Sequence, residues 1–190
     1  KGHPAYVVYP PLDENEKINL IALSEGYEAI ITEFPPPKYS VAMIHGRMNS
    51  QERDEIMYNF SKGKIDILVA TTVIEVGVDV PNASIMIIEN AERFGLAQLH
   101  QLRGRVGRSS EQAYCILIGG ENISENAVHR LRVMVETTDG FKIAEEDYRL
   151  RGPGEIEGVR QSGERFFNIV DPINDQNLIE YTNKFAKEII

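Results

Sequence analysis

The sequence lacks the features that stabilise most secreted and membrane proteins. Its 190 residues contain one cysteine, no tryptophan and no apolar run long enough to cross a bilayer. Cys115 has no second cysteine with which to form an internal disulfide, which fits a reducing cytoplasm, and we expect it to be a small buried strand residue. No signal peptide is visible. These observations predict a cytoplasmic globular protein of one domain, or of one domain with an appendage.

Basic charge is also scarce. The 20 lysines and arginines are outnumbered by 29 acidic residues, and the net charge of −9 argues against a protein that coats DNA without regard to its sequence. The exception is the stretch 93–108, which holds four arginines and no acidic residue. Any binding of nucleic acid is therefore expected to be local and sensitive to salt.

Hydrophobic residues, 42% of the chain, are grouped in a pattern typical of an α/β protein. Continuous apolar runs alternate with amphipathic segments, which predicts a parallel sheet with helices on both faces. The predicted strands are 5–9, 41–44, 66–71, 84–88 and 113–118. The predicted helices between them are about 14–31, 50–62 and 94–103.

The character of the chain changes after Gly120. Helices are predicted at 126–136 and 142–150, followed by a Gly/Pro-rich stretch that reaches Gly163 and by a final helix from about 175 to 190. These elements cannot extend a parallel sheet. We therefore expect two domains: 1–120, and an appendage, 121–190.

The stretch 98–108 has the most unusual composition. Arg103, Arg105 and Arg108 cannot share one helical face, so the segment is expected to leave a helix as a turn that presents its guanidinium groups outward. Guanidinium groups bind phosphate oxygens bidentately, and the intervening glycines permit a close approach. A polyphosphate or a nucleic-acid backbone is the expected partner, and a solvated basic loop with ordinary salt bridges is the alternative.

Two other loops follow predicted strands. Thr71 and Thr72 can donate hydrogen bonds to a phosphate oxygen and Asp79 can accept one from a ribose hydroxyl, although Thr71 could equally be a helix cap. Arg47 follows the strand 41–44 and could equally be an ordinary surface charge. Because ligands bind at the carboxyl ends of parallel strands, we expect these loops, the segment 89–95 and the arginine turn to meet at one edge of the sheet.

The order of Gln101, Gly104, Arg105 and Arg108 resembles motif six of the superfamily two helicases, and 71–81 resembles their motif five. The resemblance implies a RecA-like fold in which Arg105 and Arg108 contact the γ-phosphate of an ATP molecule held by a neighbouring domain. It also implies a set of further site residues: Gln101 beside these arginines, Gly77 and Asp79 at the nucleotide, and Gly46, Arg47, Thr71 and Thr72 on the nucleic-acid backbone.

The segments 71–107, 139–141, 149–155 and 161–163 resemble more particularly the RecG family of DNA translocases. The resemblance implies a helical hairpin and loop that couple motor movement to duplex DNA, with Arg132, Arg151 and Gln161 as the coupling residues. Alternatively, Arg132 and Arg151 pair with Glu145, Glu146 or Glu155 to hold the hairpin together. Transcription-repair coupling translocases share this hairpin, but their motif usually lacks the proline of 152–154. The sequence departs from the family pattern at Glu157, where the family usually has an apolar residue, and in the unusual triple-proline connector 35–37.

Three kinds of site are missing from the sequence. It contains no Gly-x-x-x-x-Gly-Lys-Ser/Thr loop and no acidic strand-end motif for magnesium, so ATP and Mg²⁺ are expected to be held mainly by a separate P-loop motor domain. The four histidines have no partners at metal-ligand spacing, so no metal site is predicted.

The resemblance thus implies that the chain is the C-terminal motor domain of an ATP-dependent DNA helicase that remodels stalled forks and Holliday junctions in repair and recombination. The chain alone is expected to be inactive. Its implied partners are branched duplex DNA and the P-loop and wedge domains of the same protein. The alternative from another class is a phosphate-binding interaction module without motor action.

Overall fold

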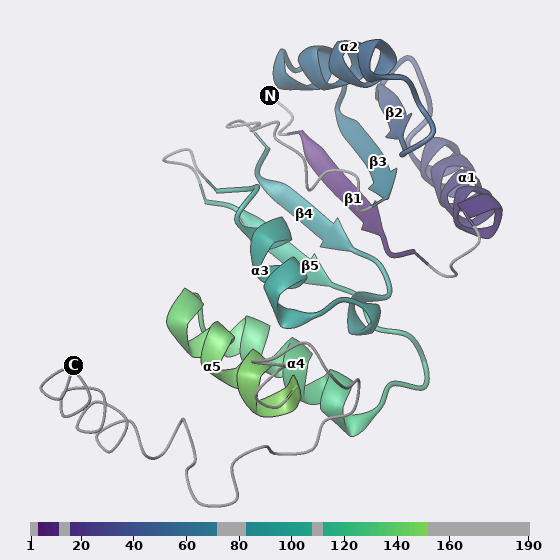
Figure 1. Ribbon diagram of the computed structural model, residues 1–190. Coiled ribbons are helices and arrows are strands. Elements are labelled where there is room, and N and C mark those ends of the chain that lie inside the picture. The colour runs from purple at the N-terminus through teal and green to yellow at the C-terminus, as the bar shows by residue number, and fades with distance from the viewer. Residues whose placement is uncertain (1–3, 12–15, 72–82, 108–111, 152–190) are drawn as a thin grey trace, which may run out of the picture. The chain divides into compact units, whose positions relative to one another are not determined.

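The computed structural model describes residues 4–11, 16–71, 83–107 and 112–151 (Figure 1). All five predicted strands are present, and every predicted helix up to residue 151 is present within two residues of its expected bounds. The strands are β1 (Ala5–Tyr9), β2 (Val41–Ile44), β3 (Ile67–Thr71), β4 (Ile85–Ile88) and β5 (Tyr114–Leu117). The helices are α1 (Glu16–Glu33), α2 (Ser50–Ser61), the 3₁₀ helix η2 (Ala91–Arg93), α3 (Leu96–Arg103), α4 (Glu125–Glu136) and α5 (Gly140–Arg151). The helix predicted at 175–190 lies outside the described residues.

The five strands form one sheet in the order β2-β3-β1-β4-β5. Every neighbouring pair is parallel, with Val7 of β1 opposite Val69 of β3 and Ile87 of β4. The arrowheads in Figure 1 accordingly point the same way. The predicted fold class, a parallel α/β sheet, is confirmed.

Helices cover both faces of this sheet. Tyr6 of β1 packs edge-on against Phe60 of α2, with ring centroids 4.7 Å apart. Tyr9, three residues further along β1, lies so close to Gly26 of α1 that an added Cβ there would force the tyrosine ring to shift. Because residues three apart on a strand point to opposite faces, α1 and α2 lie on opposite sides of the sheet.

The start of α2 is held by a capping box. The Asn49 side chain accepts a hydrogen bond from the Glu52 backbone N–H (2.8 Å), and the Glu52 carboxylate accepts one from the Asn49 N–H (3.4 Å). Two otherwise unpaired backbone donors are thereby satisfied at the first turn. The cap fixes the point at which the loop after β2, which carries Arg47, enters its helix.

The chain forms two compact units, 1–136 and 137–190. The first unit includes α4, which contacts α3 and η2. Helix α5 belongs to the second unit. No helix among the described residues combines the length and the apolar character needed to span a membrane.

Candidate functional site

The structure divides the predicted site residues between two opposite edges of the sheet. Gly46 and Arg47 follow β2, and Thr71 is the last residue of β3, so these residues lie at the carboxyl edge. Helix α3 starts near the same edge, because the Ala91 N–H donates to the Ile118 carbonyl just after β5 (2.7 Å). The helix then runs back to the amino edge, as a helix joining two parallel strands must.

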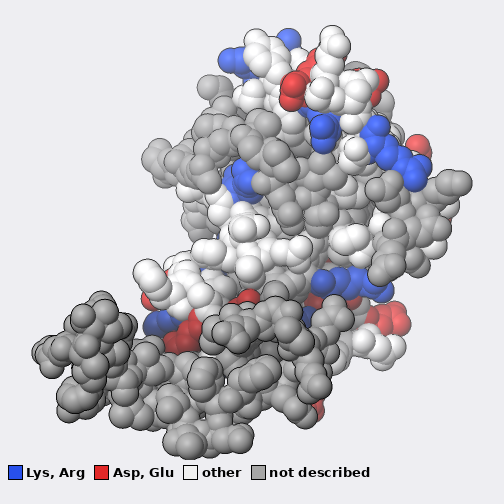
Figure 2. Space-filling view, in the orientation of Figure 1, with Lys and Arg blue, Asp and Glu red and all other residues white. Residues whose placement is uncertain are grey.

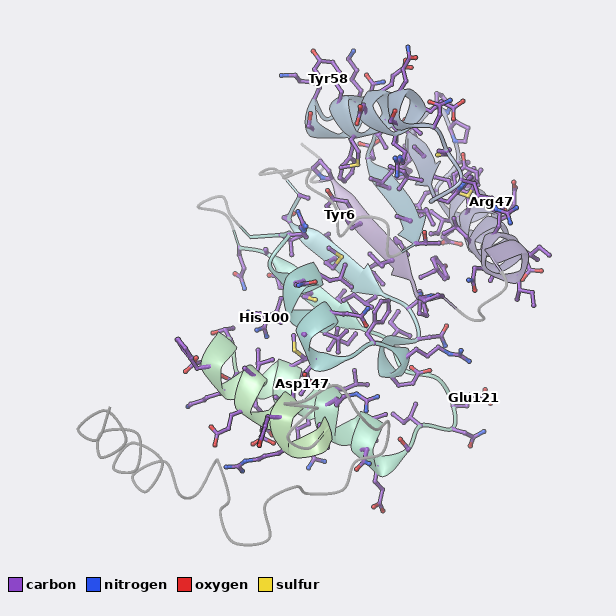
Figure 3. All side chains as sticks on the ribbon, in the orientation of Figure 1. Tyr6, Arg47, Tyr58, His100, Glu121 and Asp147 are labelled. Carbon is purple, nitrogen blue, oxygen red and sulfur yellow. The ribbon has the colours of Figure 1, made fainter. Side chains whose placement is uncertain are left out.

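The arginine turn follows α3 and therefore lies at the amino edge. A Cβ added to Gly107 would lie 3.0 Å from the Cβ of Ala113, the residue immediately before β5. The first residue of β5, Tyr114, donates its N–H to the Ser84 carbonyl at the start of β4 (2.7 Å). In Figure 3, His100 on α3 and Arg47 lie on opposite sides of the strands. The prediction that all these loops meet at one edge is wrong for the arginine turn. Helix α3 lies between the carboxyl end of β4 and the turn, and it carries the turn to the other edge.

At the carboxyl edge, Arg47 lies in a tight exposed turn. The backbone N–H groups of Arg47 and Met48 both bond to His45, at its Nδ1 atom and its carbonyl oxygen respectively (3.2 Å each). Arg47 and Gly46 are exposed, and Thr71 is half-buried. Thr72, Gly77 and Asp79 lie outside the described residues.

Tyr9 and Glu89 are two residues at this edge that the sequence did not single out. The Glu89 N–H donates to the Val8 carbonyl (2.9 Å), which brings the end of β4 beside the end of β1. Burial raises the pKa of the Glu89 carboxyl. The pKa of the Tyr9 phenol is also raised, mainly by burial and to a lesser extent by the charge of Glu89. A carboxylate directly after a buried strand is the sequence signal that could have identified Glu89.

At the amino edge, the arginine turn is built on a firmly packed helix. Leu96, Leu99 and Leu102 anchor α3, each with at most 1% of its surface exposed. The Gly104 and Arg105 N–H groups then bond back to the carbonyls of His100 (3.0 Å) and Leu102 (2.9 Å). Gln101 is exposed and Arg105 is half-buried, whereas Arg108 lies outside the described residues.

Arg103 does not point outward as predicted. Its Nη1 atom donates to the Met134 carbonyl of α4 (2.7 Å), and its Nη2 atom lies 3.2 Å from Nδ1 of His100. Arg103 is the last residue of α3 rather than part of the turn, so its side chain follows the helix surface. It also lies close enough to Cys115 to lower the pKa of the thiol, although burial dominates and raises that pKa to about 11.

Of the three predicted coupling residues, Arg132 and Arg151 lie in described helices. Arg132 is an exposed residue of α4. Arg151 ends α5, and Gln161 lies outside the described residues. Glu145 and Glu146 both pair within α5, with Arg149, at 2.8 and 3.4 Å, and sequence reasoning did not identify this arginine.

The described surface carries both signs of charge. Figure 2 shows lysine and arginine side chains interspersed with acidic ones on the visible face, rather than gathered in one large basic area. Such a surface favours binding through a few specific residues over binding through a broad basic field.

Alanine at Gly107 is expected to destabilise the chain by about 1–2 kcal/mol, because φ of +82° is costly for any residue with a Cβ. Alanine at Gly104 is the matched control. There φ is −67° and the nearest atoms to an added Cβ are 3.4 Å away, so the expected change is within about 0.5 kcal/mol. Urea unfolding of both variants measures the difference, and equal losses would contradict a need for the left-handed conformation.

Comparisons with known proteins agree over the whole chain. A family model described as the helicase conserved C-terminal domain matches residues 12–110, and one described as ATP-dependent DNA helicase RecG, domain 3, C-terminal, matches residues 137–190. A Thermotoga maritima protein named ATP-dependent DNA helicase RecG is 49% identical over 189 residues, which cover 100% of this chain and 24% of that protein. The chain thus spans about a quarter of the length of the curated relatives it matches.

Solved structures agree as well. A structure of RecG bound to a three-way DNA junction has a TM-score of 0.70 and 47% identity, and the match covers 94% of this chain and 22% of that one. The C-terminal domain of the DEAD-box protein Dbp5 has a TM-score of 0.51 at 19% identity, and the match covers 78% of this chain and 83% of that one. The second likeness concerns the fold alone.

Proposed function

The chain belongs to the helicase C-terminal domain family, as a RecG-type member, and from this we propose that it is the second motor domain of an ATP-dependent DNA helicase. The whole protein would translocate on duplex DNA and remodel stalled forks and Holliday junctions. The observation that carries the proposal is the placement of the arginine turn and of Arg47 and Thr71 at opposite edges of one sheet. A motor domain needs a nucleotide contact and a DNA contact that move together.

The amino edge is the proposed nucleotide side. Arg105 and Arg108 would neutralise the charge that develops on the γ-phosphate, and Gln101 would help to position them. Gly77 and Asp79 would contact the nucleotide. Since the sequence has no P-loop, ATP and Mg²⁺ would be held mainly by the other motor domain of the same protein.

The carboxyl edge is the proposed DNA side. The guanidinium of Arg47 and the hydroxyls of Thr71 and Thr72 are donors that suit phosphate oxygens, and Gly46 leaves room for the DNA backbone to approach. These contacts would hold the DNA backbone without reading bases. Branched DNA is the proposed substrate because the related RecG structure is bound to a three-way junction, and its recognition would require a wedge domain in the same protein.

The residues 121–190 are proposed to act as the coupling appendage, with Arg132, Arg151 and Gln161 passing motor movement to the duplex. The high identity to proteins named RecG favours this function over a transcription-repair coupling translocase.

In the whole protein, a three-way junction is expected to stimulate ATP hydrolysis and to be unwound. Replacing Arg47 with alanine should raise the DNA concentration for half-maximal ATPase by about 10-fold and reduce the salt slope by about one, because one phosphate contact is lost. Lys38→Ala is the matched control, since it removes the same charge from an exposed residue just before β2, at the opposite edge. DNA binding without any ATP turnover by the whole protein would instead favour an interaction module.

A further inference from the structure

We propose that Arg93 is a further contact to the DNA backbone, so that one DNA strand crosses the carboxyl edge of the sheet from Arg47, after β2, to Arg93, after β4. The inference rests on the proposed function, which assigns this edge to DNA. Arg93 has no role in either of the two proposed sites. Its ligand would be a phosphate of the same strand that Arg47 contacts.

Arg93 belongs to the carboxyl edge, although the sequence groups it with the arginine turn. Helix α3 divides the basic stretch 93–108, because Arg93 precedes its first residue, Leu96, and Arg103 is its last. The eight residues of α3 rise by about 12 Å along the helix axis. Arg93 therefore lies at the opposite edge from Arg105, and the proposed nucleotide site does not account for it.

The turn that presents Arg93 is firmly held by the sheet. The Ala91 N–H donates to the Ile118 carbonyl just after β5 (2.7 Å), and the Phe94 N–H bonds back to the Ala91 carbonyl (3.2 Å). Ala91 and Phe94 are 0% and 1% exposed. The exposed side chain of Arg93 thus extends from a base that two buried residues fix on either side.

The entry to this turn uses a backbone conformation that most residues avoid. Asn90 has φ of +46° and ψ of +48°, in the left-handed region, which asparagine tolerates better than most residues with a Cβ. Its carbonyl accepts the Arg93 N–H (3.0 Å). The chain therefore leaves β4 and turns at once into η2. Residues held in such sparsely populated conformations cluster at functional sites, which supports a role for the side chain that the turn presents.

The acidic residues of this turn are less exposed than Arg93. The Glu92 carboxylate accepts a hydrogen bond from the Gly120 N–H (3.1 Å), and the Glu92 carbonyl accepts one from Nη2 of Arg130 (2.7 Å). Glu89 and Glu92 are both half-buried, whereas Arg93 is exposed. A phosphate that approaches this edge would therefore meet the guanidinium of Arg93 before either carboxylate.

The spacing of the two arginines suits one DNA strand. Arg47 follows β2 and Arg93 follows β4, which are three positions apart in the order β2-β3-β1-β4. At about 4.8 Å for each step, the two strand ends are on the order of 14 Å apart. Phosphates of one DNA strand follow each other about every 3.4 Å along the axis, so the span corresponds to about four nucleotides. Thr71, at the end of β3, lies between the two arginines.

The first test measures binding of a three-way junction by the whole protein. Arg93→Ala should weaken binding by about 10-fold and reduce the salt slope by about one, and the double variant with Arg47→Ala should reduce the slope by about two. Arg93→Lys keeps the charge and should recover most of the affinity. Lys64→Ala is the matched control, since it removes a charge from an exposed residue before β3, at the amino edge, and should change neither value.

A second test locates the two contacts on the DNA. Single phosphates in one arm of the junction are replaced in turn by uncharged methylphosphonates, and binding by the parent should weaken at both contacted phosphates. Arg93→Ala should be insensitive to replacement at one of these phosphates, and Arg47→Ala at another, about four nucleotides away on the same strand.

Two results would overturn the inference: an affinity and salt slope like those of the parent in Arg93→Ala, or insensitivity of both variants at the same phosphate. If Arg93→Ala does not fold, Arg93→Gln replaces it and is judged by the same outcomes. A parent protein whose junction binding does not respond to Arg47→Ala would instead contradict the assignment of the carboxyl edge to DNA, which separates a failure of the proposed function from a failure of this inference.

Discussion

Replacing Arg105 with alanine is expected to reduce the DNA-stimulated ATPase of the whole protein by about three orders of magnitude or more, the scale at which arginine fingers act. The turn at the amino edge holds Arg105 by a backbone bond to Leu102 (2.9 Å), so its guanidinium extends from a fixed base. Its charge would act on the γ-phosphate in the transition state and much less in the ground state. The loss should therefore appear in kcat more than in the KM for ATP.

The control for this prediction comes from the other edge of the sheet. Arg47→Ala also removes an arginine but should leave kcat close to that of the parent at saturating DNA. Arg105→Lys is expected to recover only a small part of the loss, because an ammonium cannot donate in a bidentate manner to phosphate oxygens. If Arg105→Ala changed the DNA requirement and left kcat intact, the assignment of the amino edge to the nucleotide would be wrong. We expect Arg108→Ala to behave like Arg105→Ala.

The purified 190-residue chain is expected to hydrolyse ATP at the background rate, with or without forked DNA. In the proposed function the chain would supply arginines for a γ-phosphate, but its sequence has no P-loop to hold the nucleotide and no acidic motif to hold Mg²⁺. Steady-state phosphate release, measured beside the whole protein, tests this. Robust turnover by the chain alone, lost in Arg105→Ala, would show that it contains a complete active site.

A mixing experiment extends this prediction. Addition of a separate polypeptide that carries the P-loop domain should restore DNA-stimulated turnover, and Arg105→Ala in the present chain should abolish it again. If the two polypeptides associate, as sedimentation can establish, and no turnover appears, the arginines serve binding and the interaction-module alternative gains support.

Much of this protein was determined by the sequence alone. The alternation of apolar runs and amphipathic segments predicted all five strands and the helices between them, because burial on both faces of a parallel sheet demands it. The concentration of arginines in 98–108 and the missing P-loop were equally visible, since both depend on residue types at short spacing. Even the left-handed residue of the turn, Gly107, is a glycine for a local steric reason.

Only the tertiary structure decided where these residues lie. Spacing along the chain does not reveal that the eight residues of α3 carry the arginine turn to the amino edge, away from Arg47 and Thr71. Nor does it reveal that Arg103 turns inward to Met134, 31 positions away in the sequence, or that Tyr9 and Glu89 become neighbours across two strands. Each of these facts depends on pairing between segments distant in the chain. Local propensity and charge carry no information about that pairing, whereas the packed sheet specifies it.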